Sequence, residues 1–133
     1  MKSLIVEDDF VGRLLLQRYL APFGPCHVAV NGQEAIVAYG QSIQDKEPYD
    51  LICLDIMMPG IDGHEVLKHI RTCEDAIESP KISVKIIMTT AMADKANVFK
   101  AFRSQCDAYL PKPIRKDKLL EQLVELGLLQ AAE

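Results

Sequence analysis

Reactive polar side chains gather directly after short apolar runs at four places in this 133-residue chain. They are Glu7, Asp8, Asp9, Asp55, Thr89, Thr90 and Lys112. Carboxylates crowded into one crevice repel each other, so one of them must take up a proton unless a cation neutralises them. Mg²⁺ suits such a crevice, because it prefers oxygen ligands, uses one or two carboxylates and takes the rest from water or phosphate. These residue types therefore favour Mg²⁺-assisted phosphoryl chemistry, in which Mn²⁺ could substitute.

The other residue types in this set could accept a phosphoryl group and bind its oxygens. An aspartate can itself accept a phosphoryl group and form an acyl phosphate. A lysine supplies positive charge, and a threonine supplies a hydroxyl donor, to the phosphoryl oxygens. We interpret the set as an aspartate nucleophile, a Mg²⁺ site, a lysine and a threonine that together accept or catalyse phosphoryl transfer.

The elements that must position these residues alternate between short apolar strands and amphipathic helices. Strands are predicted over residues 4–6, 27–30, 51–54, 84–88 and 108–110. Helices are predicted over residues 10–21, 32–43, 94–104 and 115–127, and a further helix opens at residues 62–63 and ends before a polar loop over 73–83. This alternation predicts an α/β fold, a doubly wound five-stranded parallel sheet with five helices on its two faces. Because ligands bind beyond the carboxyl ends of such strands, the reactive residues should converge there.

Composition and charge narrow the class of protein. The net charge is −4, which disfavours non-specific nucleic-acid binding because that needs a basic face. No apolar run approaches the roughly 20 residues of a membrane span, and the N-terminus lacks the apolar region of a secretory signal. We expect a cytoplasmic protein with a single domain over residues 1–133, whose core covers about residues 2–127.

The cysteines and histidines predict no further chemistry. The four cysteines form no Cys-x-x-Cys pair, and no histidine stands at zinc-site spacing from them. Cys53 lies in an apolar run, where a buried and inert thiol is expected. His27, His64 and His69 are scattered, and we expect all three to be exposed.

Four stretches of the chain resemble the signature motifs of the response-regulator receiver family. They lie at residues 6–9, 54–63, 88–91 and 109–113, in the family's order, and the resemblance covers essentially the whole chain. The resemblance implies a flavodoxin-like fold with the strand order 2-1-3-4-5.

The same resemblance implies a metal site built on two aspartates. Asp55 would be both the phosphoacceptor and a metal ligand, and Asp8 would be the second direct ligand. Glu7 would act mainly through water, and the backbone carbonyl of Met57 would complete the protein ligands. Aligning Asp8 and Asp9 as the acidic pair is an alternative, but Asp9 stands where a helix begins, and a carboxylate is favoured there in any case.

The resemblance also implies a switch. Lys112 would be the family's phosphate-site lysine, Thr90 the switch hydroxyl, and Tyr109 the aromatic that turns inward when Thr90 engages phosphate. The Lys112–Pro113 bond would be cis, as in the family. Thr89 competes with Thr90 for the hydroxyl role. Alternation along a strand points the two side chains in opposite directions, so only one of them can face the pocket. Phosphorylation would then reshape the surface around residues 92–112.

The lifetime of the phosphorylated state should depend on two methionines. In the family, the residues two beyond the phosphoacceptor and two beyond the switch threonine flank the path of the hydrolytic water. Here they are Met57 and Met92. A thioether is only a weak hydrogen-bond acceptor, so neither side chain can orient a water strongly. We therefore predict a comparatively long-lived acyl phosphate.

We thus predict a stand-alone receiver that takes a phosphoryl group from a histidine kinase or phosphotransfer protein and signals by altered protein–protein binding. It would be a monomer or a phosphorylation-dependent dimer, and it would catalyse at most its own phosphorylation and dephosphorylation. The chain stops soon after its last predicted helix, so no DNA-binding output domain is expected. The main alternative is a pseudo-receiver scaffold that acts without phosphorylation.

Two other functions fit the residues less well. A phosphatase of the haloacid-dehalogenase type needs a second aspartate two residues after its nucleophile, where this chain has Met57. A flavin or nucleotide binder needs a Gly- or Ser/Thr-rich loop after the first strand, where this chain has acidic residues.

Overall fold

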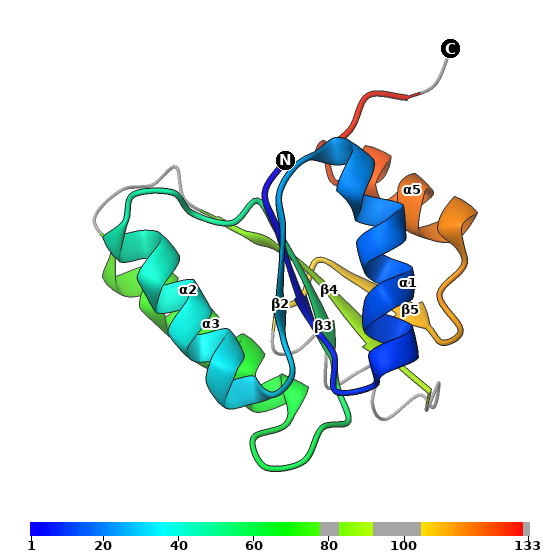
Figure 1. Ribbon diagram of the computed structural model, residues 1–133. Helices are drawn as coiled ribbons and strands as arrows, with labels where there is room; N and C mark the ends of the chain where they lie inside the picture. Colours follow the sequence, from blue (N-terminus) through cyan, green and yellow to red (C-terminus); the bar gives the residue numbers. More distant parts are fainter. Residues whose placement is uncertain (78–82, 92–104, 132–133) are drawn as a thin grey trace.

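The computed structural model describes residues 1–77, 83–91 and 105–131. At its centre is a parallel sheet of five strands in the order β2-β1-β3-β4-β5 (Figure 1). The strands are β1 (Ser3–Val6), β2 (Cys26–Ala29), β3 (Leu51–Asp55), β4 (Lys85–Thr90) and β5 (Ala108–Pro111). The predicted α/β fold and the strand order 2-1-3-4-5 are confirmed.

Helices cover both faces of this sheet. One face carries α1 (Phe10–Leu20), which continues into the short η1 (Ala21–Phe23), and α5 (Lys116–Glu125), and the other carries α2 (Gly32–Gln44) and α3 (Gly63–Ala76) (Figure 1). These are the four α-helices within the described residues, and the helix predicted over residues 94–104 lies outside them. In the part of the chain that the structure describes, no helix is long and apolar enough to cross a membrane.

Side-chain caps fix where three of the helices begin. The carboxylate of Asp9 accepts a hydrogen bond from the backbone N–H of Gly12, 2.9 Å away, and so caps α1. Asn31 and Asp62 cap α2 and α3 in the same way. Each cap follows directly on the loop that leaves a strand, so each helix starts at the carboxyl edge of the sheet.

Two apolar cores lie on opposite faces of the sheet. Successive strand residues alternate between them, so Leu4 belongs to the core beneath α2 and α3, whereas Ile5 belongs to the core beneath α1 and α5. Cys53 is buried in the second core, where burial raises the pKa of its thiol to about 12. The expectation of a buried thiol at this position is confirmed.

The end of α3 differs from the sequence-based expectation. The helix continues through Ala76, so the start of the loop predicted over residues 73–83 is wrong. Arg71 and Glu74 form an ion pair of 2.8 Å one turn apart, and Glu74 also accepts a hydrogen bond from the N–H of Val84. These polar residues are therefore bound within the fold, and their polarity does not indicate a solvated loop.

Arg71 also ties α3 to the start of β5. Its guanidinium donates to the carboxylate of Asp107 at 2.7 Å and to the backbone carbonyl of Gln105 at 3.0 Å. The Asp107 carboxylate in turn accepts from the N–H of Ile86 in β4. Charged hydrogen bonds of this kind are stronger than neutral ones, so Arg71 fixes the amino ends of β4 and β5.

The prediction for the histidines is wrong at one of its three positions. His27 and His69 are exposed, as expected, but His64 is only 6% exposed. It lies three residues before the buried Leu67, on the same face of α3. The spacing between His64 and His69 does not show this.

Candidate functional site

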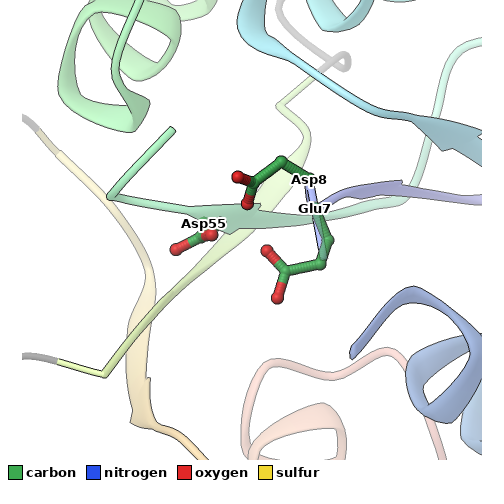
Figure 2. A group of neighbouring side chains, drawn as sticks. All are labelled: Glu7, Asp8 and Asp55. Atoms are coloured by element: carbon green, nitrogen blue, oxygen red, sulfur yellow. The ribbon is translucent and has the colours of Figure 1, made fainter. Parts of the chain in front are cut away.

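Three carboxylates meet at the carboxyl edge of the sheet. Glu7, Asp8 and Asp55 each offer an oxygen, and these oxygens all lie within 4.8 Å of one another (Figure 2). Glu7 and Asp55 are 2% exposed, whereas Asp8 is exposed. A crevice with two buried carboxylates and one open to solvent suits a hard divalent cation that retains some of its water.

The strand ends explain this convergence. Glu7 directly follows β1 and extends its pairing, because its N–H donates to the carbonyl of Ala29 at 3.1 Å. Asp55 is the last residue of β3, which lies beside β1 in the sheet. Parallel strands end at one edge, so residues 48 positions apart in the chain become neighbours.

Lys112 joins the cluster from the end of β5. Its ammonium contacts an oxygen of Glu7 and lies 3.1 Å from Oδ2 of Asp55. The following Lys112–Pro113 peptide bond is cis, as the resemblance predicted. The backbone N–H of Lys112 donates to the carbonyl of Thr90, which fixes the loop against β4.

Burial and mutual contact shift the ionisation of this cluster. Burial, the largest cause, and the neighbouring Asp55 together raise the pKa of Glu7 to about 8 against the opposing effect of Lys112. Burial lowers the pKa of Lys112, but its contacts with Glu7 and Asp55 outweigh burial, so its pKa lies above the ordinary value. Near neutral pH and without a cation, Glu7 therefore holds a proton that a metal ion could replace.

The two threonines lie side by side at the end of β4. Both are buried, Thr89 being 2% exposed and Thr90 0%. The strand register sets Thr89 beside Asp55, whereas Thr90 is one residue closer to the edge of the sheet, beside Pro111. Tyr109 lies two residues earlier on β5, half-buried against the core beneath α2 and α3.

The two methionines of the hydrolysis hypothesis differ in what the structure describes. Met57 is 55% exposed, and its backbone N–H donates to Oδ1 of Asp55 at 3.2 Å. Met57 therefore lies next to the phosphoacceptor candidate with its side chain open to solvent. Met92 lies outside the described residues.

Arg13 contributes to the site and was missed by the sequence reasoning. Its guanidinium donates to the backbone carbonyls of Glu7 and Asp8, at 3.1 and 3.0 Å. The arginine thereby holds the acidic turn against the start of α1. Its position one turn after the capping Asp9 indicates that it lies near the acidic residues. The sequence cannot show which backbone carbonyls it binds, because every residue has one.

Gly63 was predicted only to open a helix, and its close approach to Asp55 was missed by the sequence reasoning. A Cβ on Gly63 would lie 2.4 Å from the carbonyl oxygen of Asp55. The first turn of α3 therefore packs directly on the backbone of the phosphoacceptor candidate, which only a glycine allows.

Comparison with known proteins places this architecture in a family. The model of the response regulator receiver domain matches residues 3–124, and the chain belongs to that family. The transcriptional regulatory protein ResD of Bacillus subtilis is 41% identical over 113 residues, which cover 84% of this chain and 42% of ResD. Hybrid signal transduction histidine kinase L of Dictyostelium discoideum is 34% identical over 128 residues, 95% of this chain and 7% of the kinase. The chain spans about half the length, or less, of curated relatives such as these.

The fold is shared with solved receiver structures. The CheX–CheY–BeF₃–Mg²⁺ complex from Borrelia burgdorferi matches with a TM-score of 0.83 and 22% identity, covering 97% of this chain and 90% of that one. The receiver domain of the histidine kinase CKI1 from Arabidopsis thaliana, complexed with Mg²⁺ and BeF₃⁻, matches with a TM-score of 0.76 and 22% identity, covering 96% of this chain and 88% of that one. Receiver domains are phosphoacceptor modules of two-component signalling, and this chain belongs to the receiver family.

Proposed function

We propose that this receiver accepts a phosphoryl group on Asp55 from a histidine kinase or phosphotransfer protein, in a Mg²⁺-dependent reaction, and signals by altered protein–protein binding. The observation that carries the proposal is the position of Lys112, whose ammonium contacts Asp55 inside the carboxylate cluster. A nucleophilic carboxylate, a cation beside it and a buried hydroxyl at the neighbouring strand end are the parts that acyl-phosphate formation needs.

The residues present fit a divalent cation. Asp8 and Asp55 would bind it directly, the backbone carbonyl of Met57 would add a third protein ligand, and Glu7 would act through water. Bound there, Mg²⁺ supplies positive charge to the oxygens of the transferring group. Asp9 is engaged as the cap of α1, which favours Glu7 and Asp8 over Asp8 and Asp9 as the acidic pair. Mn²⁺ could replace Mg²⁺ on the same oxygen ligands.

The transfer is a substitution at phosphorus. A carboxylate oxygen of Asp55 forms the new O–P bond while the N–P bond of a phosphohistidine donor breaks, and the imidazole leaves with the electron pair. Lys112 balances the negative charge of the phosphoryl oxygens, and the hydroxyl of Thr90 donates to one of them. Asp55 is held for this attack by the N–H of Met57 and the ammonium of Lys112.

The output would follow from the engagement of Thr90. New phosphate oxygens would draw the Thr90 hydroxyl toward Asp55, and Tyr109 would move inward into the vacated space. The surface around residues 105–112 would then present a different shape to a partner protein. The rest of the predicted switch surface, residues 92–104, lies outside the described residues. We propose that residues 1–133 act as a single cytoplasmic domain, either as a monomer or as a dimer that forms on phosphorylation. Met57 and Met92 would slow hydrolysis of the acyl phosphate.

A pseudo-receiver scaffold is the competing function. Such a protein has no use for a lysine packed against two buried acidic side chains, because burying charged groups costs free energy. Here Lys112 contacts both Glu7 and Asp55, which favours the phosphorylated receiver.

The proposal is tested by incubating the purified protein with acetyl phosphate and measuring its intact mass, with Mg²⁺ and with EDTA. We expect the mass of one phosphoryl group to be added in Mg²⁺ only. A protein that gains no phosphoryl group in Mg²⁺, from acetyl phosphate or from a phosphorylated phosphotransfer protein, would be the scaffold instead.

A further inference from the structure

Gly12 occupies an unusual place in α1. It is the third residue of the helix, where a glycine costs about 0.5–1 kcal/mol relative to alanine. A Cβ built on Gly12 would lie 2.6 Å from Oε1 of Glu7 and 3.3 Å from the Cδ and Cγ atoms of the same side chain. The side chain of Glu7 therefore fills the space that any other residue at position 12 would need.

The atom in question belongs to the carboxylate cluster. Oε1 of Glu7 is the oxygen that contacts the ammonium of Lys112, and Glu7 is 2% exposed. A groove of about 440 Å³ between α1 and the segment that follows β5 is lined by Glu7, Gly12 and Lys112. An added methyl group would therefore press on the end of a flexible side chain, and the groove offers that side chain somewhere to go.

We propose that Gly12 is a positioning residue of the metal site. Its missing side chain lets the Glu7 carboxylate lie against α1, in contact with Lys112 and within reach of Asp8 and Asp55. This inference rests on the proposed function, because it concerns the same Mg²⁺ site. A residue at position 12 with a side chain would move the carboxylate out of the cluster and leave the fold intact.

Gly40 provides a matched control. It also lies inside a helix, α2, but a Cβ on Gly40 would meet no atom within 4 Å. Gly40→Ala therefore reports the gain in helix propensity alone, with no effect on the carboxylate cluster.

The experiment measures the Kd of Mg²⁺ by calorimetry and the urea midpoint of the metal-free protein for the parent, Gly12→Ala and Gly40→Ala. We expect Gly40→Ala to raise the urea midpoint and to leave the Kd unchanged. Gly12→Ala should fold, but its Kd for Mg²⁺ should rise about tenfold. Disturbing a group that acts on a metal through water, as Glu7 would, usually weakens binding on this scale. A Gly12→Ala protein that binds Mg²⁺ as the parent does, or that fails to fold, would overturn the inference.

A second comparison tests whether the effect passes through Glu7. Glu7→Asp shortens the side chain by one methylene and so withdraws it from Gly12. In the Glu7→Asp background, Gly12→Ala should change the Kd by less than twofold, because residues in contact are not additive. An equal tenfold effect in both backgrounds would show that Gly12 does not act through Glu7.

The two hypotheses fail differently. A parent protein that binds no Mg²⁺ contradicts the proposed function and this inference together. A parent that binds Mg²⁺ and gains a phosphoryl group, alongside a Gly12→Ala variant with the same Kd, contradicts the inference alone.

Discussion

The ammonium of Lys112 lies 3.1 Å from Oδ2 of Asp55, although 57 positions separate the two residues in the chain. The side chain of Asp55 is 3% exposed and that of Lys112 is 25% exposed, so water screens this ion pair only partly. The ammonium that would balance the charge of a phosphoryl group thus already lies beside the Asp55 oxygen that would accept that group.

Replacing Lys112 should slow phosphorylation strongly and affect folding less. Lys112→Gln removes the positive charge next to Asp55, and losing one such electrostatic contact to a transition state costs on the order of 10²-fold in rate. The rate is measured as the gain of phosphoryl mass from acetyl phosphate in Mg²⁺. Lys118→Gln is the control, because Lys118 pairs with Glu121 on the exposed surface of α5. Equal rates for the two variants would contradict the role of Lys112.

The affinity for Mg²⁺ should depend on pH through Glu7. The pKa of Glu7 is raised from 4.5 to about 8, so between these values the folded protein holds a proton that the unfolded chain has lost. The stability that this proton confers is present below about pH 4.5 and is lost as pH rises through about 8. A cation must displace the same proton, so the affinity for Mg²⁺ should rise up to about tenfold per pH unit and level off near pH 8.

Calorimetry in a series of buffers measures both the affinity and the proton released. Glu7→Gln should bind Mg²⁺ with an affinity that depends less on pH, because the titrating group is gone. A parent affinity that is constant between about pH 6 and 8, with no proton release, would contradict the assignment.

Phosphorylation should change amide exchange near Tyr109. Beryllofluoride mimics the phosphoryl group, and its oxygen-like fluorines would draw the Thr90 hydroxyl toward Asp55. We expect the exchange rates of residues 105–112 to differ with and without beryllofluoride and Mg²⁺, while β2 at the far edge of the sheet stays unchanged. Identical exchange at residues 105–112 would argue against the switch mechanism while leaving phosphorylation intact.

The acyl phosphate should be lost faster once a water can be oriented beside it. Met57 lies next to Asp55 and is 55% exposed, and a thioether holds water weakly. The double variant Met57→Asn, Met92→Glu should dephosphorylate roughly tenfold faster or more, because positioning dominates phosphoryl transfer. The decay of phosphoryl mass after removal of the donor measures this. A variant no faster than the parent would refute the hypothesis.

The fold and the convergence of the reactive residues could be predicted from the sequence because both follow from local patterns. Short apolar runs such as residues 51–54 indicate strands, and the ends of parallel strands meet at one edge. The caps at Asp9, Asn31 and Asp62 are local as well, because each side chain accepts from the N–H three residues later. Family resemblance supplied the strand order and the cis bond before Pro113, which apolar periodicity alone does not specify.

The contacts that were missed depend on partners distant in the chain or on backbone atoms. Arg71 meets Asp107 across 36 positions, a separation at which the sequence indicates no contact. Arg13 binds backbone carbonyls, which carry no residue type. The burial of His64 depends on which face of α3 meets the sheet, and the need for glycine at positions 12 and 63 appears only when interatomic distances are known.

The most direct test of the central hypothesis compares Asp55→Asn with Asp9→Asn. Asp9 lies close to the site but caps α1, and asparagine caps a helix as well as aspartate does, so Asp9→Asn should leave the fold and the phosphoryl gain unchanged. Asp55→Asn removes the proposed acceptor and should abolish the gain of phosphoryl mass from acetyl phosphate in Mg²⁺. An Asp55→Asn protein that still gains one phosphoryl group at a rate comparable to the parent would contradict the assignment of Asp55 as the phosphoacceptor.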